Sequence, residues 1–170
     1  MELRLEAPRP EHRQLVEAYR REFLNSGDSI DGSAGLAWCS GFDEWMALLA
    51  DNSRDETARP GCVATSVFLA FDGPQLVGMV DIRHRLNDYL RRYCGHIGYS
   101  VRPALRRRGY ATAILSLALE ECRRLSLARV MLTCEKRNVA SARTMLHCGA
   151  VLQDELLMGN ITIQRYWIEL

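Results

Sequence analysis

Neither sign of charge dominates this sequence, and no part of it is a long hydrophobic run. The 22 Lys and Arg residues nearly balance the 21 Asp and Glu residues, which leaves a formal net charge of +1. Proteins that bind polyanions non-specifically are normally far more basic, so we expect no nucleic-acid partner. The apolar stretches fall short of the roughly 18 residues of a membrane span, and the N-terminus lacks the apolar core of a signal peptide. These absences predict a cytoplasmic protein without a membrane partner.

The sequence also lacks any closely spaced pair of cysteines. Its six cysteines are Cys39, Cys62, Cys94, Cys122, Cys134 and Cys148. Zinc ribbons and dithiol redox sites need a C-x-x-C pair, and none is present. We therefore expect no metal site, and we expect most of these thiols to be buried and reduced.

What is present is an ordinary globular composition, with 48% hydrophobic and 25% charged residues in 170. Without a repeat, a low-complexity segment or a linker, this length predicts one domain, residues 1–170. Hydrophobic periodicity predicts helices around 15–26, 42–49, 111–125 and 138–147. It predicts strands around 3–5, 63–71, 76–82, 96–101, 130–133, 151–157 and 161–170. This order predicts an α/β fold with a mixed, mostly antiparallel sheet flanked by about four helices.

The segment Tyr99–Thr112 carries the clearest chemistry, because a strand passes through an arginine-rich turn into a helix there. The first N–H groups of a helix lack partners and lie at the positive end of its dipole, so they bind phosphate or pyrophosphate. Gly109 leaves room for a close ligand, and Arg106, Arg107 and Arg108 supply positive charge. A solvated basic turn is the alternative interpretation.

Three motifs resemble those of one family. Arg106-x-x-Gly109-x-Ala111 resembles the pyrophosphate-binding R/Q-x-x-G-x-G/A motif of the GNAT superfamily of acetyl-CoA-dependent N-acetyltransferases. Asn138-x-x-Ser141, followed by Gly149-Ala150, resembles a later signature of the same family. Arg83–Leu90 and His96–Tyr99 resemble an uncharacterised branch of it. The element order also matches nearly end to end, so the resemblance implies a GNAT-like fold that uses acetyl-CoA as cosubstrate.

The resemblance further implies where the cofactor binds. The acyl-pantetheine arm would lie between two splayed strands, the diphosphate would bind N–H groups of residues 107–112, and Arg106 would close the turn. Asn138 would hydrogen-bond the arm with Ser141 beside it, and Asn138 is also a natural helix N-cap. The expected cofactor-binding residues are Tyr99, Ser100, Val101, Arg106, Arg107, Arg108, Gly109, Tyr110, Ala111, Thr112, Asn138 and Ser141.

Acetyl transfer to an amine needs a base for the amine proton, and an acid can protonate the leaving thiolate. Some relatives place a tyrosine acid and a glutamate base where this chain has Met145 and Thr133. We expect His96 to be the base, because an imidazole titrates near neutrality and some relatives carry a base at that position. Glu135 is the second choice, since it shares a sheet face with Thr133. A structural histidine and a solvated glutamate are the alternatives.

Other residues are weaker candidates. His84 and Asp88 could line the acceptor site, and Tyr166 could reach the thiolate, although a core position is the commoner role for such a tyrosine. Cys134 and Cys148 are unfavoured as nucleophiles, because no histidine is placed to activate them.

The acceptor pocket is expected between the two early helices. Asp28, Asp31, Phe42 and Trp45 would line it, and carboxylates with aromatics favour a cationic amine.

Three functions fit these observations. The favoured one is an N-acetyltransferase that moves an acetyl group from acetyl-CoA to a primary amine, on a small molecule or a peptide, by direct transfer in a ternary complex. The alternative is a non-catalytic acyl-CoA-binding or regulatory module of the same fold. The third is a nucleotide-phosphate binder, against which the lack of G-x-x-x-x-G-K-[ST] counts. A homodimer joined at a sheet edge is compatible with each.

Overall fold

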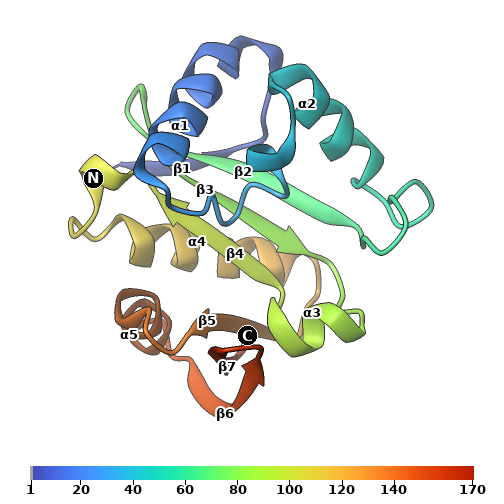
Figure 1. Ribbon diagram of the computed structural model, residues 1–170, viewed down its shortest axis with the longest axis vertical. Helices are drawn as coiled ribbons and strands as arrows, with labels where there is room; N and C mark the ends of the chain where they lie inside the picture. The colour runs from blue at the N-terminus through green and yellow to red at the C-terminus, as the bar shows by residue number, and fades with distance from the viewer. Residues whose placement is uncertain (1) are drawn as a thin grey trace.

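The computed structural model describes residues 2–170 (Figure 1). Its strands are β1 (Leu3–Glu6), β2 (Thr65–Asp72), β3 (Gln75–Arg83), β4 (Ile97–Val101), β5 (Arg129–Glu135), β6 (Val151–Met158) and β7 (Ile161–Glu169). Its α-helices are α1 (Arg13–Ser26), α2 (Phe42–Asp51), α3 (Asp88–Tyr93), α4 (Tyr110–Arg124) and α5 (Val139–His147). Short 3₁₀ turns span Pro10–His12, Leu36–Trp38 and Pro103–Leu105.

The strands form two antiparallel sheets. One has the order β1-β2-β3-β4, and the other has the order β5-β7-β6. Helices α1 and α2 cover one face of the first sheet, while α4 covers its opposite face (Figure 1). Helix α5 lies beside the second sheet and also contacts α4.

Two hydrophobic cores hold these layers together. Met79 of β3 is buried against α1 and α2, in a core that includes Tyr19 and Trp45. The next residue, Val80, faces the other way into the core around α4, which extends to the second sheet through Leu132. Because successive strand residues point to opposite faces, a sheet covered on both sides has apolar residues at nearly every position. This explains why the β3 segment is so uniformly hydrophobic.

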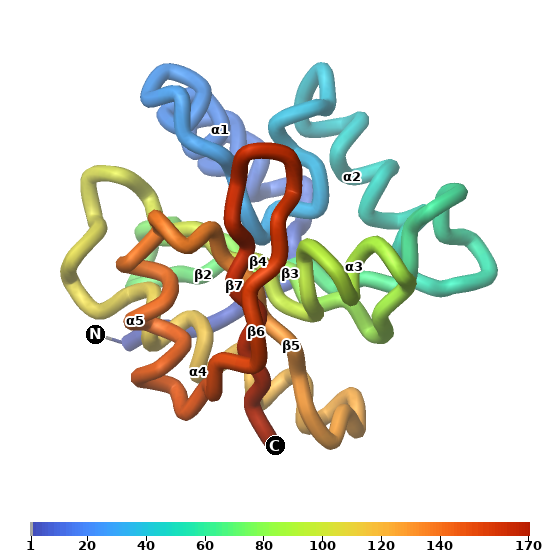
Figure 2. Tube along the Cα trace, turned by 60° about the horizontal axis from the view of Figure 1, so that its bottom comes forward, coloured from blue at the N-terminus to red at the C-terminus, as the bar shows by residue number. Residues whose placement is uncertain are grey.

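The two sheets touch at one point and then separate. Gly95 forms an isolated bridge with Leu132, and the next amide, that of His96, donates to the carbonyl of Met131 at 2.7 Å. A side chain on Gly95 would collide with the carbonyl oxygen of Met131, since a Cβ there would lie 2.4 Å from it. Beyond this contact β4 continues toward α4, and β5 toward α5. Figure 2 shows the second sheet and α5 from another direction.

The predicted order of strands and helices is confirmed, and so is the α/β fold class. Two details differ. The expected mixed sheet is a pair of antiparallel sheets, and residues 2–170 form five α-helices instead of about four. The added helix, α3, has only 6 residues and no buried side chain, so hydrophobic periodicity has nothing to reveal. Its N-cap is Asn87, whose side chain accepts the amide of Leu90 at 2.9 Å.

In residues 2–170, no helix is both long and apolar enough to cross a membrane.

Candidate functional site

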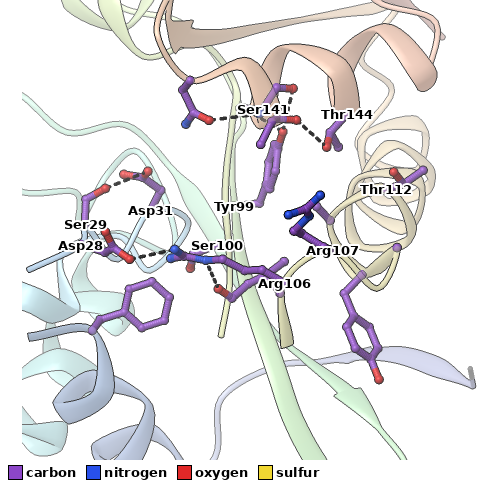
Figure 3. A pocket seen from close by; sticks show the side chains of 17 residues that line it. Asp28, Ser29, Asp31, Tyr99, Ser100, Arg106, Arg107, Thr112, Ser141 and Thr144 are labelled. Carbon is purple, nitrogen blue, oxygen red and sulfur yellow. Dashed lines mark hydrogen bonds and ion pairs between the residues drawn. The ribbon is translucent and has the colours of Figure 1, made fainter. Parts of the chain in front are cut away.

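A cavity of about 680 Å³ lies between β4, the first turn of α4 and the start of α5 (Figure 3). Its walls come from β4, the turn before α4, the start of α5 and the loop between α1 and α2. The lining residues are Phe23, Asp28, Ser29, Asp31, Tyr99, Ser100, Val101, Arg106, Arg107, Gly109, Tyr110, Ala111, Thr112, Asn138, Ala140, Ser141 and Thr144. The structure thus brings together every expected cofactor-binding residue except Arg108, which is not part of the lining.

Two residues with unusual backbone conformation form the turn before α4. Arg107 and Gly109 both have positive φ, 62° and 84°, in the left-handed region that a glycine enters without strain. Gly109 is the N-cap of α4, and the first helical hydrogen bond runs from the amide of Ala113 to the carbonyl of Gly109 at 3.1 Å. The N–H groups of residues 110–112 therefore have no partner within the helix. Together with the dipole of α4, they form a site suited to an anion.

Arg106 joins this turn to the loop between α1 and α2. Its guanidinium lies 2.8 Å from the carboxylate of Asp28, and its Nε donates to the carbonyl of Val101 at 3.3 Å. The guanidinium also lies 5.8 Å from the ring centroid of Phe23. Figure 3 shows the side chain reaching across β4 to Asp28. The positive charge of Arg106 is thus shared with a carboxylate of the cavity wall.

The exposed edge of β4 provides a second kind of binding surface. β4 is the last strand of its sheet, and it pairs with β3 alone over Ile97–Val101. The amide of Arg102 donates to the carbonyl of Val77, so the alternating ladder pairs Ser100 with β3 and turns the backbone groups of Tyr99 and Val101 toward the opening. An extended ligand with amide groups could pair with this edge as another strand does.

Two residues connect this edge to α5. The Tyr99 hydroxyl lies 2.9 Å from Oγ of Ser141, and burial raises the pKa of Tyr99 to about 12, so the phenol is protonated at neutral pH. The side chain of Asn138 accepts the amide of Ser141 at 3.1 Å, which confirms the predicted N-cap. Asn138 and Ser141 therefore sit at the cavity wall with defined orientations.

The loop between α1 and α2 contributes the acidic part of the lining. The carboxylate of Asp31 accepts the Ser29 hydroxyl at 3.0 Å. Partial burial raises the pKa of Asp31, and the negative charges of Asp81 and Glu135 raise it further, while the Ser29 hydroxyl and the charge of Arg83 act in the opposite direction. Asp31 is therefore a carboxylate whose proton affinity is increased at the cavity.

Two of the expected acceptor-site residues lie elsewhere. Phe42 and Trp45 belong to α2 and are buried in the core that it forms with α1 and the first sheet, and the indole N–H of Trp45 donates to the carbonyl of Ser33 at 2.7 Å. Their helical spacing reflects packing against the sheet, so the acceptor-site assignment of both is wrong.

The position of His96 does not suit the expected base. The residue is buried and does not line the cavity, and its Nδ1 accepts the amide of Met131 at 2.9 Å. The hydrogen of a neutral imidazole must then be on Nε2, so the ring has no lone pair left for a substrate proton. Burial, and then the charges of Arg91 and Arg83, lower the pKa of His96 to about 4. The structural alternative raised by the sequence describes this histidine better.

Glu135, the second choice for the base, does not line the cavity either. Its carboxylate pairs with Arg137, and it lines a smaller cavity beside the β6–β7 turn. The two positions where some relatives carry a tyrosine acid and a glutamate base hold no proton-transfer group in this chain. Met145 is fully buried, and the hydroxyl of Thr133 donates to the carbonyl of Tyr93 at 2.9 Å.

The weaker candidates are also engaged elsewhere. His84 lies 2.8 Å from the Ser66 hydroxyl, Asp88 is exposed in the first turn of α3, and neither lines the cavity. Tyr166 is buried and donates to the side chain of Gln164 at 2.8 Å.

The two cysteines near the site are poor nucleophiles. Burial raises the pKa of the Cys134 thiol to about 11, and it also raises the pKa of Cys148. Since the thiolate is the reactive form, burial disfavours both side chains as nucleophiles. Among residues 2–170, no group of three or more His, Cys, Asp and Glu side chains is arranged to hold a metal ion.

Four lining residues are absent from the sequence-based prediction, namely Phe23, Ser29, Ala140 and Thr144. Thr144 lies three residues after Ser141 on α5, a spacing that places the two on one helix face and could have revealed it. Phe23 has the spacing of a core residue on α1, and it does pack in the core. The sequence therefore gives no signal that it also lines the cavity.

Comparison with known proteins agrees with this geometry. No curated protein sequence matches the chain. One similar solved structure is a variant of the spermidine N-acetyltransferase from Vibrio cholerae, with 19% identity and a TM-score of 0.68 over 99% of this chain and 95% of that one. A second is a GNAT-family acetyltransferase from Streptococcus pneumoniae, with 18% identity and a TM-score of 0.66 over 99% of this chain and 100% of that one. A third is a protein from Salmonella typhimurium that is described as an acetyltransferase and was solved with its cofactor acetyl-CoA, with 16% identity and a TM-score of 0.59 over 99% of this chain and 94% of that one. At these identities the likeness shows a shared fold. The sequence model of the acetyltransferase (GNAT) family matches residues 30–150, and the chain therefore belongs to this family of acetyltransferases.

Proposed function

We propose that residues 1–170 form one N-acetyltransferase domain, which moves an acetyl group from acetyl-CoA to a primary amine by direct transfer in a ternary complex. One observation carries this proposal. A single cavity connects the anion-binding turn before α4, the exposed edge of β4 and the carboxylate of Asp31. These three features match the diphosphate, the amide-containing arm and the amine acceptor of such a reaction.

The residues present fit acetyl-CoA. The N–H groups of residues 110–112 and the guanidinium of Arg107 suit a diphosphate, and the backbone of Tyr99 and Val101 suits the amides of a pantetheine arm. Asn138 lies on the facing wall, where its side-chain amide has donors left after the N-cap bond. We propose that these residues bind the cofactor, with Ser100, Arg106, Gly109, Tyr110, Ala111, Thr112 and Ser141 completing the contact surface. Acetyl-CoA supplies an acetyl group activated as a thioester.

The acceptor is best described as a cationic amine. Asp28 and Asp31 both face the cavity, but the charge of Asp28 is balanced by Arg106. Within residues 2–170 no basic side chain bonds to Asp31, so its carboxylate is available to an ammonium group. We infer that Asp31 binds the acceptor, and that it takes the ammonium proton directly or through a water molecule as the amine attacks. The relative from Vibrio cholerae is named for spermidine, which belongs to this chemical class.

We further propose a cytoplasmic protein that assembles with copies of itself. β6 is an edge strand with exposed Val151 and Leu157 side chains, and edge strands of this kind pair readily with another chain. The spermidine N-acetyltransferase of Vibrio cholerae is described as dodecameric. Light scattering coupled to size-exclusion chromatography measures the assembly directly.

Two measurements test the proposed activity. Calorimetry with acetyl-CoA, CoA and ATP should show binding of the first two at a single site and weaker binding of ATP. A panel of cationic, neutral and anionic acceptors, each mixed with acetyl-CoA, should release free thiol fastest with the cationic amines. Tighter binding of ATP than of CoA would contradict the cofactor assignment. Equal rates for cationic and anionic acceptors would contradict the role of Asp31.

A further inference from the structure

A buried carboxylate, that of Asp81, hydrogen-bonds to the loop that carries Asp28 and Asp31. Asp81, on β3, is 1% exposed. One oxygen accepts the amide of Ala34 in the loop at 3.0 Å, and the other accepts the amide of Gly98 in β4 at 3.1 Å. The guanidinium of Arg83 lies 3.3 Å away. A buried carboxylate is costly unless hydrogen bonds and an opposite charge compensate it, and here three partners do so.

The loop lies directly on β4 at this point. A Cβ on Gly32 would be 2.5 Å from the carbonyl oxygen of Gly98 and 2.7 Å from Cα of Tyr99, so any side chain at position 32 would lift the loop off the strand. Contacts from the core reinforce the arrangement. The hydroxyl of Ser33 donates to the carbonyl of Ile30 at 2.8 Å, and Trp45 holds the Ser33 carbonyl.

These contacts connect the strand that forms the cofactor wall to the loop that forms the acidic wall. Asp81 bonds to Gly98, the residue before Tyr99 on β4, and to Ala34, three residues after Asp31. Asp31 itself is held by one bond to Ser29, within the same loop. Its position relative to β4 therefore depends on where Asp81 fixes the loop.

We propose that Asp81 is a positioning residue for the acceptor: it holds the loop 28–34 against β4 so that Asp31 faces the acyl group. This inference rests on the proposed function. Asp81 does not line the cavity, so it acts through Ala34 and Gly98 and does not touch substrate.

Asp81→Asn tests the inference with almost no change in shape. An amide keeps one accepting oxygen and replaces the other with an NH₂ group, so one of the two backbone N–H groups faces a donor. Asp55→Asn is the matched control. Asp55 also accepts a backbone amide, that of Ala64 at 2.8 Å, and pairs with an arginine, Arg85 at 2.9 Å, but neither partner belongs to the loop 28–34 or to β4.

Gly32→Ala is the second variant, and it keeps the test decisive if Asp81→Asn fails to fold. It pushes the loop from β4 without touching the buried carboxylate, so both variants should act alike.

We expect the two loop variants to weaken binding of the amine acceptor but not binding of CoA. In Asp81→Asn and Gly32→Ala the KM for a cationic amine should rise about tenfold or more, as one charge-assisted contact is misplaced. The Kd for CoA should change less than about twofold, and Asp55→Asn should leave both constants near their wild-type values. Amide hydrogen exchange of residues 28–34 should accelerate in the first two variants without any ligand present.

An unchanged acceptor KM together with unchanged exchange in the loop would overturn the inference. A matching loss of CoA and amine binding would overturn it too, since it would show a general structural role. If the wild-type protein acetylates no amine, the proposed function fails, while the exchange measurement still decides whether Asp81 holds the loop.

Discussion

The two ends of the cavity are built from different chemistry. At the end near α4 the wall is mostly backbone, where Arg107 and Gly109 take positive φ angles and the first turn of α4 offers its N–H groups. At the end near the loop the wall is made by side chains, of which Asp31 is the clearest example. The first end is fixed by neighbours in the sequence. The second end is fixed by contacts with distant strands, because Ala34 lies 47 positions from its partner Asp81.

This difference explains what each end can recognise. Backbone N–H groups at a helix terminus bind the same anion in any chain that forms the turn, so such a site can be shared across a family. A carboxylate on a loop is changed by one substitution, and its position follows the packing beneath it. We therefore expect the α4 end to serve the cofactor that the family has in common, and the loop end to define the acceptor.

The most damaging change should be Gly109→Val, which alters the backbone end itself. A β-branched side chain is strained at φ 84° and projects where the diphosphate would approach. Loss of two charge-assisted hydrogen bonds, at about 1.5 kcal/mol each, predicts CoA binding that is weaker by about a hundredfold in calorimetry.

Gly61→Val is the control for backbone strain. Gly61 has a similar φ of 81°, but a Cβ there would meet no atom within 4 Å, and it does not line the cavity. It should lower stability while leaving CoA affinity unchanged. Equal affinity of folded Gly109→Val and wild type would remove the diphosphate from this turn.

The next largest effect should come from Asp31→Asn at the loop end. The variant keeps the size of the side chain and removes its charge, so kcat/KM for a cationic amine should fall about tenfold or more while CoA affinity stays the same. Glu135→Gln is the comparison, and its effect should be smaller because that carboxylate already pairs with Arg137. Steady-state kinetics at saturating acetyl-CoA measures both, and a larger effect of Glu135→Gln would reverse the assignment.

The same contrast describes how far the sequence could be interpreted without the structure. Helix α1 is predictable because Tyr19 and Phe23 recur at helical spacing and Gly27 ends it with φ 74°. The α4 end is predictable because its motif is local. Asp81 reads only as a polar residue within a β-rich segment, because both of its backbone partners are distant in the sequence. The structural role of His96 is hidden from the sequence in the same way, since the amide that occupies its ring lies 35 positions away.

A smaller effect is expected at Asn138, which combines a structural role with a binding role. Asn138→Asp keeps an oxygen that caps α5 but removes the side-chain donors, so stability should hold while CoA affinity falls several-fold. Asn138→Ala should show the same loss of affinity and an additional loss of about 1 kcal/mol in the free energy of unfolding. If Asn138→Asp binds CoA and turns over like wild type, capping is its whole role.

The smallest effect on turnover should come from His96→Asn, because the structure gives His96 a packing role outside the cavity. An Asn oxygen can accept the Met131 amide in place of Nδ1, so kcat at neutral pH should stay within about twofold of wild type.

The His96→Asn variant should instead alter stability in acid. The pKa of His96 is about 4 in the folded protein and about 6.5 in an unfolded chain, so between these values the unfolded state binds more protons and wild-type stability falls as the pH drops. This group contributes up to about 3 kcal/mol to that fall, which His96→Asn should remove. Urea denaturation at pH 7 and pH 4.5 measures the difference. A loss of kcat of about a hundredfold or more, with unchanged acid sensitivity, would restore His96 as the base and break the contrast between the two ends of the cavity.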